Sequence, residues 1–354
     1  MTQQSTIADL LAAAVCQHEG GDLAAAEVLY RQVLVREPEH PDALHLLGLI
    51  AQAAGDLTSA AAGIRHALAL RPGEAVFHYN LANVLRDAGQ LDDAIASYRA
   101  ALALHNVNRV IDADTLLNLG NALAARGEPG AAADSYRTLL QHAPTAMDGG
   151  SAGNAGAVFR PRHLEAQVNL AQVLRALGDV AGARAAYQAV VALDAGNVAA
   201  QLGLGALCQE AGDFAAAYRH YQAALQTDPS CVAAWNNLGT WHQERGEHPA
   251  AADCYRRALA LDSECGFIHH AEAHNNLGTL LADADQAAEA EACYRAALQL
   301  RPEFAEAHKN RGAVLQALGR RDEALVSFRE AVRLRPDFSE AAYKLAALSG
   351  EQPP

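Results

Sequence analysis

Residues 198–231 read VAAQLGLGALCQEAGDFAAAYRHYQAALQTDPSC, and residues 232–265 read VAAWNNLGTWHQERGEHPAAADCYRRALALDSEC. Both stretches are 34 residues long and carry similar residue types in the same order. A fixed period of this length indicates stacked supersecondary units. The whole chain must therefore be interpreted as a repeat array before any single residue is interpreted.

The repeat extends along almost the whole chain. An alanine is followed four residues later by a large side chain nine times: Ala26 and Tyr30, Ala60 and Ile64, Ala94 and Tyr98, Ala132 and Tyr136, Ala183 and Tyr187, Ala217 and Tyr221, Ala251 and Tyr255, Ala290 and Tyr294, Ala324 and Phe328. Alignment on these pairs gives the repeats 7–40, 41–74, 75–108, 113–146, 164–197, 198–231, 232–265, 271–304 and 305–338. Both halves of a repeat have apolar or small residues at helical spacing, so each repeat is predicted to be two helices.

Turn residues separate the predicted helices. A glycine ends the first helix in eight repeats (Gly21, Gly55, Gly89, Gly127, Gly178, Gly212, Gly246 and Gly319), and Asp285 takes its place in the eighth repeat. Proline closes six repeats (Pro38, Pro72, Pro144, Pro229, Pro302 and Pro336) because it cannot continue a helix. The hydrophobic content of 51% is mainly alanine and leucine, which favours helix throughout.

This pattern resembles the tetratricopeptide repeat family, whose unit is a helix-turn-helix of 34 residues with these small, glycine, Ala-x3-aromatic and proline positions. The resemblance covers residues 7–338 and implies an all-α fold, a right-handed α-solenoid or superhelix of about nine repeats. We predict repeats one to four over 7–146, a glycine-rich insertion loop over 147–163, repeats five to nine over 164–338, and a capping helix and tail over 339–354. Ala342, Leu345 and Leu348 of the capping helix are expected to cover repeat nine.

An asparagine ladder is the main candidate binding feature. In this family the first helix of each repeat lines the concave surface, and the sixth residue of that helix is asparagine in six repeats: Asn80, Asn118, Asn169, Asn237, Asn276 and Asn310. A carboxamide offers both donors and an acceptor to a peptide unit, so a ladder of them could hold an extended chain. Asn83, Asn121, Asn236 and Asn275 widen the strip. The ladder is similar to that of O-linked N-acetylglucosamine transferases, and the array as a whole resembles the repeat superhelix of these enzymes and of other bacterial multi-repeat proteins. The alternative is that these asparagines cap or bridge neighbouring helices.

Charge narrows the class of partner. The net charge of −14 and pI near 5.5 disfavour nucleic acid and anionic membranes as partners. The groove set is completed by charged residues of the same helices: Asp87, Glu210, Glu244, Asp283 and Lys309. Because acids predominate there, we expect a protein or peptide segment that is extended and neutral to basic. An arginine stripe on the second helices (Arg31, Arg65, Arg99, Arg137, Arg256, Arg295 and Arg329) is predicted to be a solvated, salt-bridged face.

No residue pattern indicates catalysis or a cofactor. His270 and His274 lie one helical turn apart near Cys265, but the H-E-x-x-H order is missing and no C-x-x-C occurs. No nucleophile is marked by a base at fixed spacing. The sequence therefore predicts a protein that is not an enzyme and has neither a metal nor a cofactor.

The functional hypotheses follow from these features. The first is an interaction scaffold or adaptor that binds an extended segment in the concave groove. The alternative is the substrate-recruiting region of a larger glycosyltransferase or methyltransferase, and the third is a self-assembling structural array. No run reaches the ~18 apolar residues of a membrane span. The N-terminal apolar run contains Asp9 and has no basic residue before it, unlike a signal peptide, so we predict a cytoplasmic protein.

Overall fold

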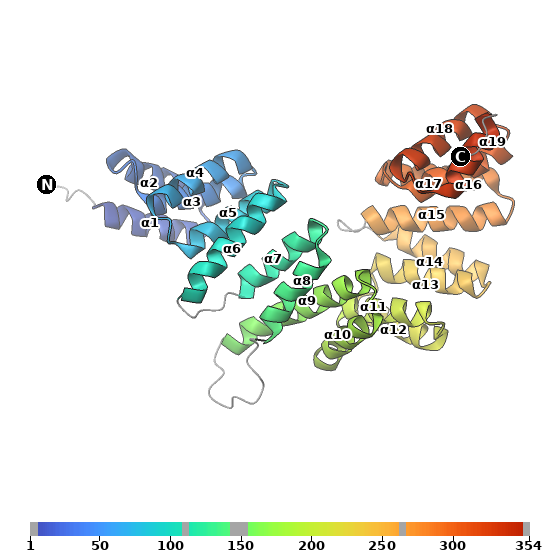
Figure 1. Cartoon of the computed structure of the whole chain (residues 1–354), viewed down its shortest axis with the longest axis horizontal. Coiled ribbons are helices and arrows are strands. Elements are labelled where there is room, and N and C mark those ends of the chain that lie inside the picture. Colours follow the sequence, from blue (N-terminus) through green and yellow to red (C-terminus); the bar gives the residue numbers. More distant parts are fainter. Residues whose placement is uncertain (1–5, 108–112, 142–154, 262–266, 350–354) are drawn as a thin grey trace. The chain divides into compact units, whose positions relative to one another are not determined.

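The computed structural model describes residues 6–107, 113–141, 155–261 and 267–349, and their regular structure is helical (Figure 1). The helices are α1 (Ile7–Glu19), α2 (Leu23–Arg36), α3 (Pro41–Ala53), α4 (Leu57–Leu70), α5 (Ala75–Asp87), α6 (Leu91–Val107), α7 (Ala113–Ala125), α8 (Pro129–Gln141), α9 (Ala155–Ala176), α10 (Val180–Leu193), α11 (Val198–Glu210), α12 (Phe214–Thr227), α13 (Val232–Glu244), α14 (His248–Ala260), α15 (Phe267–Asp283), α16 (Ala287–Leu300), α17 (Ala305–Ala317), α18 (Arg321–Leu334) and α19 (Ser339–Ser349). The predicted all-α solenoid of helix pairs is confirmed.

The chain forms two compact bodies, residues 1–186 and residues 187–354. Consecutive helices pack against each other from α1 to α9 in the first body and from α11 to α19 in the second. The first helices of neighbouring repeats also touch: α3 with α5, α5 with α7 and α7 with α9 in the first body, and α11 with α13, α13 with α15 and α15 with α17 in the second. Each body therefore has a first-helix face and a second-helix face. The right-handed course of the full array stays a prediction.

The turns inside the repeats have the backbone that the sequence predicts. The eight glycines at the ends of first helices have positive φ, and Asp285 in the eighth repeat has φ 58°. The residue after the glycine caps the second helix in several repeats. Asp22 accepts a hydrogen bond from the Ala25 amide, and Asp56 accepts one from the Ser59 amide, each at 3.0 Å. Such a side chain satisfies one of the free amides at the start of a helix.

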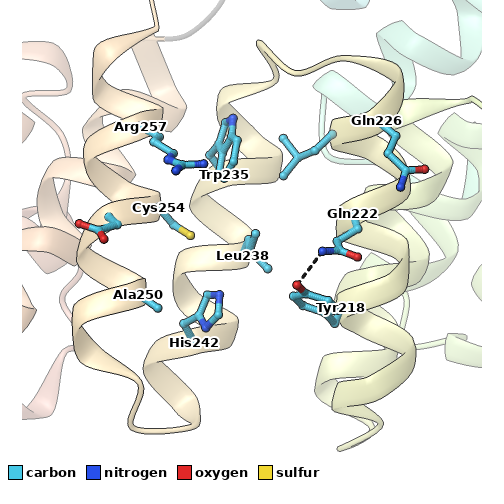
Figure 2. A pocket seen from close by; sticks show the side chains of 11 residues that line it. Tyr218, Gln222, Gln226, Trp235, Leu238, His242, Ala250, Cys254 and Arg257 are labelled. Carbon is cyan, nitrogen blue, oxygen red and sulfur yellow. Dashed lines mark hydrogen bonds between the residues drawn. The ribbon is translucent and has the colours of Figure 1, made fainter.

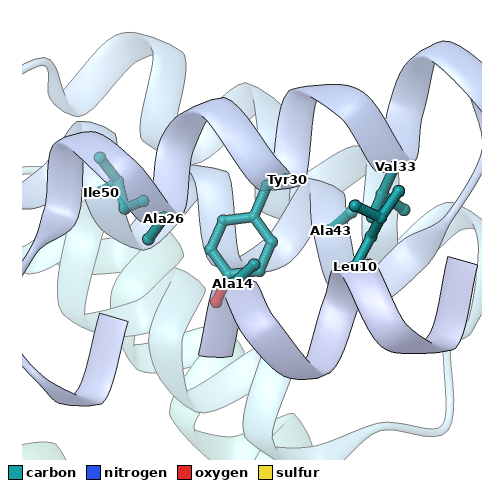
Figure 3. Close-up of a cluster of buried hydrophobic side chains, with 7 residues drawn as sticks. All are labelled: Leu10, Ala14, Ala26, Tyr30, Val33, Ala43 and Ile50. Carbon is teal, nitrogen blue, oxygen red and sulfur yellow. The ribbon is translucent and has the colours of Figure 1, made fainter. Parts of the chain in front are cut away.

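The large residues of the Ala-aromatic pairs form the core. Each is at most 3% exposed: Tyr30, Ile64, Tyr98, Tyr136, Tyr187, Tyr221, Tyr255, Tyr294 and Phe328. Figure 3 shows Tyr30 beside Ala14 and Ala26 in the first cluster. The facing position must be small, because a Cβ added to Gly239 would lie 2.5 Å from Cε1 of Tyr255. The glycine and the tyrosine are therefore complementary parts of one contact.

The insertions lengthen helices, which corrects part of the sequence prediction. The predicted loop over 147–163 overlaps α9, because this helix begins at Ala155 and contains Pro161; residues 147–154 lie outside the described residues. The added residues before repeat eight likewise extend α15 back to Phe267. Helix-compatible residues such as Ala155 and Ala157 continue into a strongly helical segment, and lengthening an existing helix costs less than starting a new one. The glycine content alone therefore overestimated the loop.

The C-terminal helix α19 packs against α18. Ala341 is buried in the cluster around Phe328, and Leu345 and Leu348 pack against this cluster. These residues are spaced i, i+4 and i+7, so they share one side of the helix. The predicted Ala342 is only partly buried, because it lies about 100° away from Ala341 around the helix. The contact residue is therefore one position earlier than predicted.

Within the described residues, none of the helices combines the length and apolar character that crossing a lipid bilayer requires.

Candidate binding site on the first helices

The six ladder asparagines (Asn80, Asn118, Asn169, Asn237, Asn276 and Asn310) lie on the first helices α5, α7, α9, α13, α15 and α17. Five of them donate through Nδ2 to the preceding repeat: Asn80 to His45 Nε2 at 2.8 Å, Asn118 to Asn83 Oδ1 at 3.3 Å, Asn169 to Asn121 Oδ1 at 2.9 Å, Asn276 to Asn236 Oδ1 at 3.2 Å, and Asn310 to Asn275 Oδ1 at 3.0 Å. These five carboxamides bridge neighbouring repeats, as the alternative interpretation of the ladder proposed.

The acceptor at the first bridge is a neutral histidine. His45 is 5% exposed, and its ring lies 4.4 Å from the ring of Phe77. Burial lowers the pKa of His45 to about 4, because the charged imidazolium loses its hydration. At neutral pH the Nε2 atom therefore has a free lone pair and accepts the hydrogen bond of Asn80.

Buried tyrosines hold the acceptors of the next two bridges. The hydroxyl of Tyr98 donates to Asn83 Oδ1 at 2.6 Å, and the hydroxyl of Tyr136 donates to Asn121 Oδ1 at 2.7 Å. Burial raises the pKa of Tyr136 to about 12 and raises that of Tyr98 further, so both hydroxyls keep their protons. The core residue of a repeat thereby orients a carboxamide that binds the next repeat.

Asn237 is the exception among the ladder asparagines. Its carboxamide makes no hydrogen bond with any described residue. The reason lies in the preceding repeat, which has Leu202 and Ala206 at the two first-helix positions that supply acceptors elsewhere. Neither side chain can accept a hydrogen bond. The asparagine is present, but its partner is missing.

A depression of about 240 Å³ opens beside Asn237, between α11 and α13. We call it the α11/α13 depression; it is lined by Ala206, Gln209, Glu210, Tyr221, Asn237, Thr240 and Glu244. Three members of the predicted groove set, Asn237, Glu210 and Glu244, therefore meet at one place. The short side chain of Ala206 leaves room where Asn83 and Asn121 stand in other repeats.

Hydrogen bonds orient the polar wall of the depression. The hydroxyl of Tyr221 donates to Gln209 Oε1 at 2.9 Å, and Gln209 Nε2 donates to Glu244 Oε2 at 2.8 Å. This series runs from the core to the surface and holds the exposed Glu244 carboxylate at the rim. Glu210 is also exposed at the rim. Two carboxylates beside a carboxamide make this place attractive to a cationic or hydrogen-bonding ligand.

The remaining predicted groove residues lie elsewhere. Asp87 accepts a hydrogen bond from Gln52 Nε2 at 2.8 Å, and Asp283 is exposed at the end of α15. Lys309 Nζ lies 3.2 Å from Glu340 Oε2 and 5.7 Å from the centre of the Phe338 ring. Because these two contacts are to the C-terminal segment, Lys309 helps to attach α19 to the array.

Four residues of the depression were not predicted as groove residues from the sequence: Ala206, Gln209, Tyr221 and Thr240. The hydroxyl of Tyr221 belongs to the core stripe, so the sequence pattern placed it in packing alone. Ala206 carries a usable signal, because it is the ninth residue of its repeat, where repeats three and four have Asn83 and Asn121. A comparison of this position between repeats would have located the missing acceptor.

Of the two histidines considered as metal ligands, His270 is held by backbone carbonyl groups. His270 Nε2 lies 3.1 Å from the carbonyl oxygen of Ala258 and 3.0 Å from that of Leu261. Burial lowers the pKa of His274, while Cys265 lies outside the described residues. In the part of the chain that the structure describes, no three His, Cys, Asp or Glu side chains are grouped as a metal site.

Comparison with known proteins identifies the family. Tetratricopeptide repeat profiles match residues 12–75, 73–144, 154–198, 197–264, 230–303 and 305–338. The chain belongs to the tetratricopeptide repeat family. Repeats of this family serve as protein-interaction scaffolds, and the fold is typically non-catalytic. No curated protein matches the chain.

One solved structure supports the fold, and two others are similar in sequence over about half of the chain. A tetratricopeptide repeat protein from Parabacteroides merdae is 17% identical, with a TM-score of 0.62 over 78% of this chain and 98% of that chain. A crystal structure of MamA is 27% identical, with a TM-score of 0.38 over 47% of this chain and 95% of that chain. A second MamA structure is 26% identical, with a TM-score of 0.38 over 49% of this chain and 92% of that chain.

Proposed function

We propose that the chain is a scaffold that binds an extended, neutral to basic segment of a partner protein on the first-helix face, at the α11/α13 depression. The observation that carries this proposal is the unpartnered carboxamide of Asn237 beside the exposed carboxylates of Glu210 and Glu244. The five other ladder asparagines already bond within the array, so their carboxamides are less available to a ligand.

The chemistry of the depression assigns a role to each group. The Asn237 carboxamide can donate to a backbone carbonyl and accept from a backbone amide, which makes the contact independent of the ligand's sequence. Glu210 and Glu244 favour a lysine or arginine side chain nearby and disfavour an acidic one. Because both carboxylates are exposed, their contribution weakens as salt screens the charges.

Three synthetic peptides test this proposal on the full chain. Each is a fluorescein-labelled peptide of twelve residues, built from repeated Gly-Ser-Ala, Gly-Ser-Lys or Gly-Ser-Glu. Fluorescence anisotropy should give micromolar affinity for the lysine peptide, weaker affinity for the alanine peptide and the weakest for the glutamate peptide. Raising the salt concentration should reduce the difference between the lysine and alanine peptides.

Matched variants locate the contact. Asn237→Ala should lower the affinity for both the lysine and alanine peptides by about tenfold, which corresponds to about 1.4 kcal/mol. Asn118→Ala makes the same chemical change in the first body, where the carboxamide is already bonded, and should leave both affinities unchanged. Glu244→Gln should weaken only the lysine peptide. Equal affinities of the parent chain and the Asn237→Ala variant would show that the depression is not the binding surface.

A further inference from the structure

A second concave surface lies between the second helices α12 and α14, over α13 (Figure 2). We call it the α12/α14 groove; its volume is about 520 Å³. Helix α13 contributes Trp235, Leu238 and His242 to it, whereas the α11/α13 depression uses Asn237, Thr240 and Glu244 of the same helix. The two sets are offset by two residues, which is about 200° around a helix. The groove and the depression therefore lie on opposite sides of α13.

The groove is elongated along the helices. Trp235, Leu238 and His242 form a stripe at i, i+3 and i+7 on α13, and the α14 wall extends over the same length from Ala250 to Arg257. Seven residues of helix correspond to about 10 Å, or two turns. Figure 2 shows the side chains of α12 and α14 on either side of the α13 stripe. This shape suits a rod-like ligand that lies between two helices.

The floor of the groove is apolar and fixed. Leu238 and Cys254 are buried, and Leu225 and Trp235 pack against the same cluster. The indole of Trp235 is held by a hydrogen bond from Nε1 to the carbonyl oxygen of Pro229 at 2.9 Å. Burial raises the pKa of the Cys254 thiol to about 11, so it stays protonated and acts as a small apolar group. The floor is therefore ready to receive apolar side chains.

One cation stands at the edge of this floor. The Arg257 guanidinium lies 4.9 Å from the centre of the Trp235 ring and makes no ion pair with any described residue. Its neighbour Arg256 differs, because Arg256 pairs with Asp253 at 3.1 Å. The stacking leaves the hydrogen-bonding edge of Arg257 available for a carboxylate.

The opposite wall of the groove is uncharged. The arginine stripe of the second helices is interrupted at Gln222, which occupies the position of Arg256 in its own repeat. Gln222 Nε2 donates to the Tyr218 hydroxyl at 2.6 Å, so its carboxamide lies along α12. The groove lining also contains one carboxylate, Asp253, which pairs with Arg256 outside the lining. Among the described residues that line the groove, Arg257 is therefore the cation that is left for the carboxylate of an incoming segment.

We propose that the α12/α14 groove binds an amphipathic helix of a partner protein. Two apolar side chains one turn apart rest on Trp235, Leu238 and Leu225, and a carboxylate one turn further along pairs with Arg257. An amphipathic helix binds a hydrophobic groove through apolar side chains that recur about one helical turn apart. The preference is opposite to that proposed for the α11/α13 depression, so the second body would hold an acidic helix on one face and a basic extended segment on the other.

Three alanine-based peptides of sixteen residues, of which two form a matched pair, test the groove on the full chain. The pair carries leucine at positions five and nine, with glutamate or lysine at position thirteen, and the third carries alanine in place of the leucines. Fluorescence anisotropy should show at least fivefold tighter binding of the glutamate peptide than of the lysine peptide, and little binding of the peptide without leucine. The net charge of −14 opposes this order, so a preference for glutamate must come from a local cation.

Arg257→Gln and Arg256→Gln form a matched pair, because they remove the same charge from adjacent exposed positions of α14. Arg257→Gln should abolish the preference for the glutamate peptide, whereas Arg256→Gln should change each affinity by less than twofold. Unchanged circular dichroism checks the fold of both variants. Asn237→Ala should not affect the helical peptides, which separates this result from that for the depression.

Other outcomes overturn the proposal. If Arg257→Gln and Arg256→Gln lose the preference for the glutamate peptide equally, the preference comes from the general charge of the surface and not from Arg257. Equal binding of the peptide without leucine would show that the apolar floor is not used. Dimerisation of the parent chain that Arg257→Gln abolishes, measured by sedimentation velocity, would assign the groove to a second copy of the chain.

Discussion

Asn237 and the five other ladder asparagines have the same residue type at the same repeat position, yet only the five bridge neighbouring repeats. The difference lies in the preceding repeat, where His45, Asn83, Asn121, Asn236 or Asn275 supplies an acceptor in those five cases. Before Asn237 the corresponding side chains are Leu202 and Ala206. The role of a repeat position thus depends on the pair of repeats and cannot be assigned from one repeat alone.

The largest change in stability should come from the core packing, which is the same in repeats with and without an asparagine bridge. Tyr255 is completely buried and packs with Leu277 and Leu280 of the next repeat. Tyr255→Ala should therefore reduce the free energy of unfolding by about 3–5 kcal/mol, measured by urea unfolding. Tyr255→Phe, which removes only the hydroxyl, should cost about 1 kcal/mol. If both variants unfold like the parent chain, the stapling role assigned to the aromatic stripe is wrong.

Acid should weaken the bridge that depends on His45. Its pKa is about 4 in the folded chain, below the ordinary 6.5, so the unfolded state binds more protons between these values. The contribution of His45 to the free energy of unfolding is therefore fully present above pH 6.5. It falls by roughly 3 kcal/mol as the pH decreases towards 4. His45→Gln keeps an acceptor without a titrating ring and should flatten this part of the pH dependence. The check is urea unfolding at a series of pH values, and identical slopes for both chains would contradict the assignment.

Removing a bridging carboxamide should cost more than removing the unbridged one. Asn276 donates to Asn236, which is only 6% exposed, so Asn276→Ala leaves a buried acceptor unsatisfied. We expect a loss of about 1–3 kcal/mol in the free energy of unfolding. Asn237→Ala should change it by less than about 0.5 kcal/mol. Thermal unfolding of the two variants measures this difference. Equal losses of stability in Asn276→Ala and Asn237→Ala would show that the bridge does not stabilise the array.

The smallest effect should come from supplying the missing acceptor. Ala206→Asn places a carboxamide where Asn83 and Asn121 stand in repeats three and four. A new hydrogen bond to Asn237 should stabilise the chain by about 0.5–1.5 kcal/mol and fill the depression. Binding of the Gly-Ser-Lys peptide should fall at the same time. Ala206→Ser is too short to form this bridge and serves as the control; stronger peptide binding by Ala206→Asn would contradict the account.

The repeat period made the fold predictable. Because every repeat encodes the same helix pair, the glycine after the first helix and the tyrosine of the second locate the turns and the core, including the exceptional Asp285. The insertions were not predictable in the same way. Residues 155–163 extend α9, because a neighbouring helix can continue through a glycine and a proline when the rest of the segment favours helix.

The candidate site was predictable only as a set of residue types. The sequence indicated that asparagines and acids share the first helices, and the structure brings Asn237, Glu210 and Glu244 together. The sequence did not indicate which asparagines would form hydrogen bonds with each other, because a hydrogen bond between repeats depends on two positions at once. The cation–π contact of Arg257 with Trp235 was likewise not predicted, because it depends on two residues of different helices.

NMR of the Asn237 side-chain amide, identified by its absence in Asn237→Ala, measures directly whether this carboxamide is free to bind a ligand. In the free chain its protons should exchange with water faster than those of the bridging Asn276. Titration with the Gly-Ser-Lys peptide should shift the Asn237 signals and slow their exchange, while the Asn276 signals stay in place. Equal protection of both carboxamides in the free chain, with no shift of Asn237 at saturating peptide, would contradict the account.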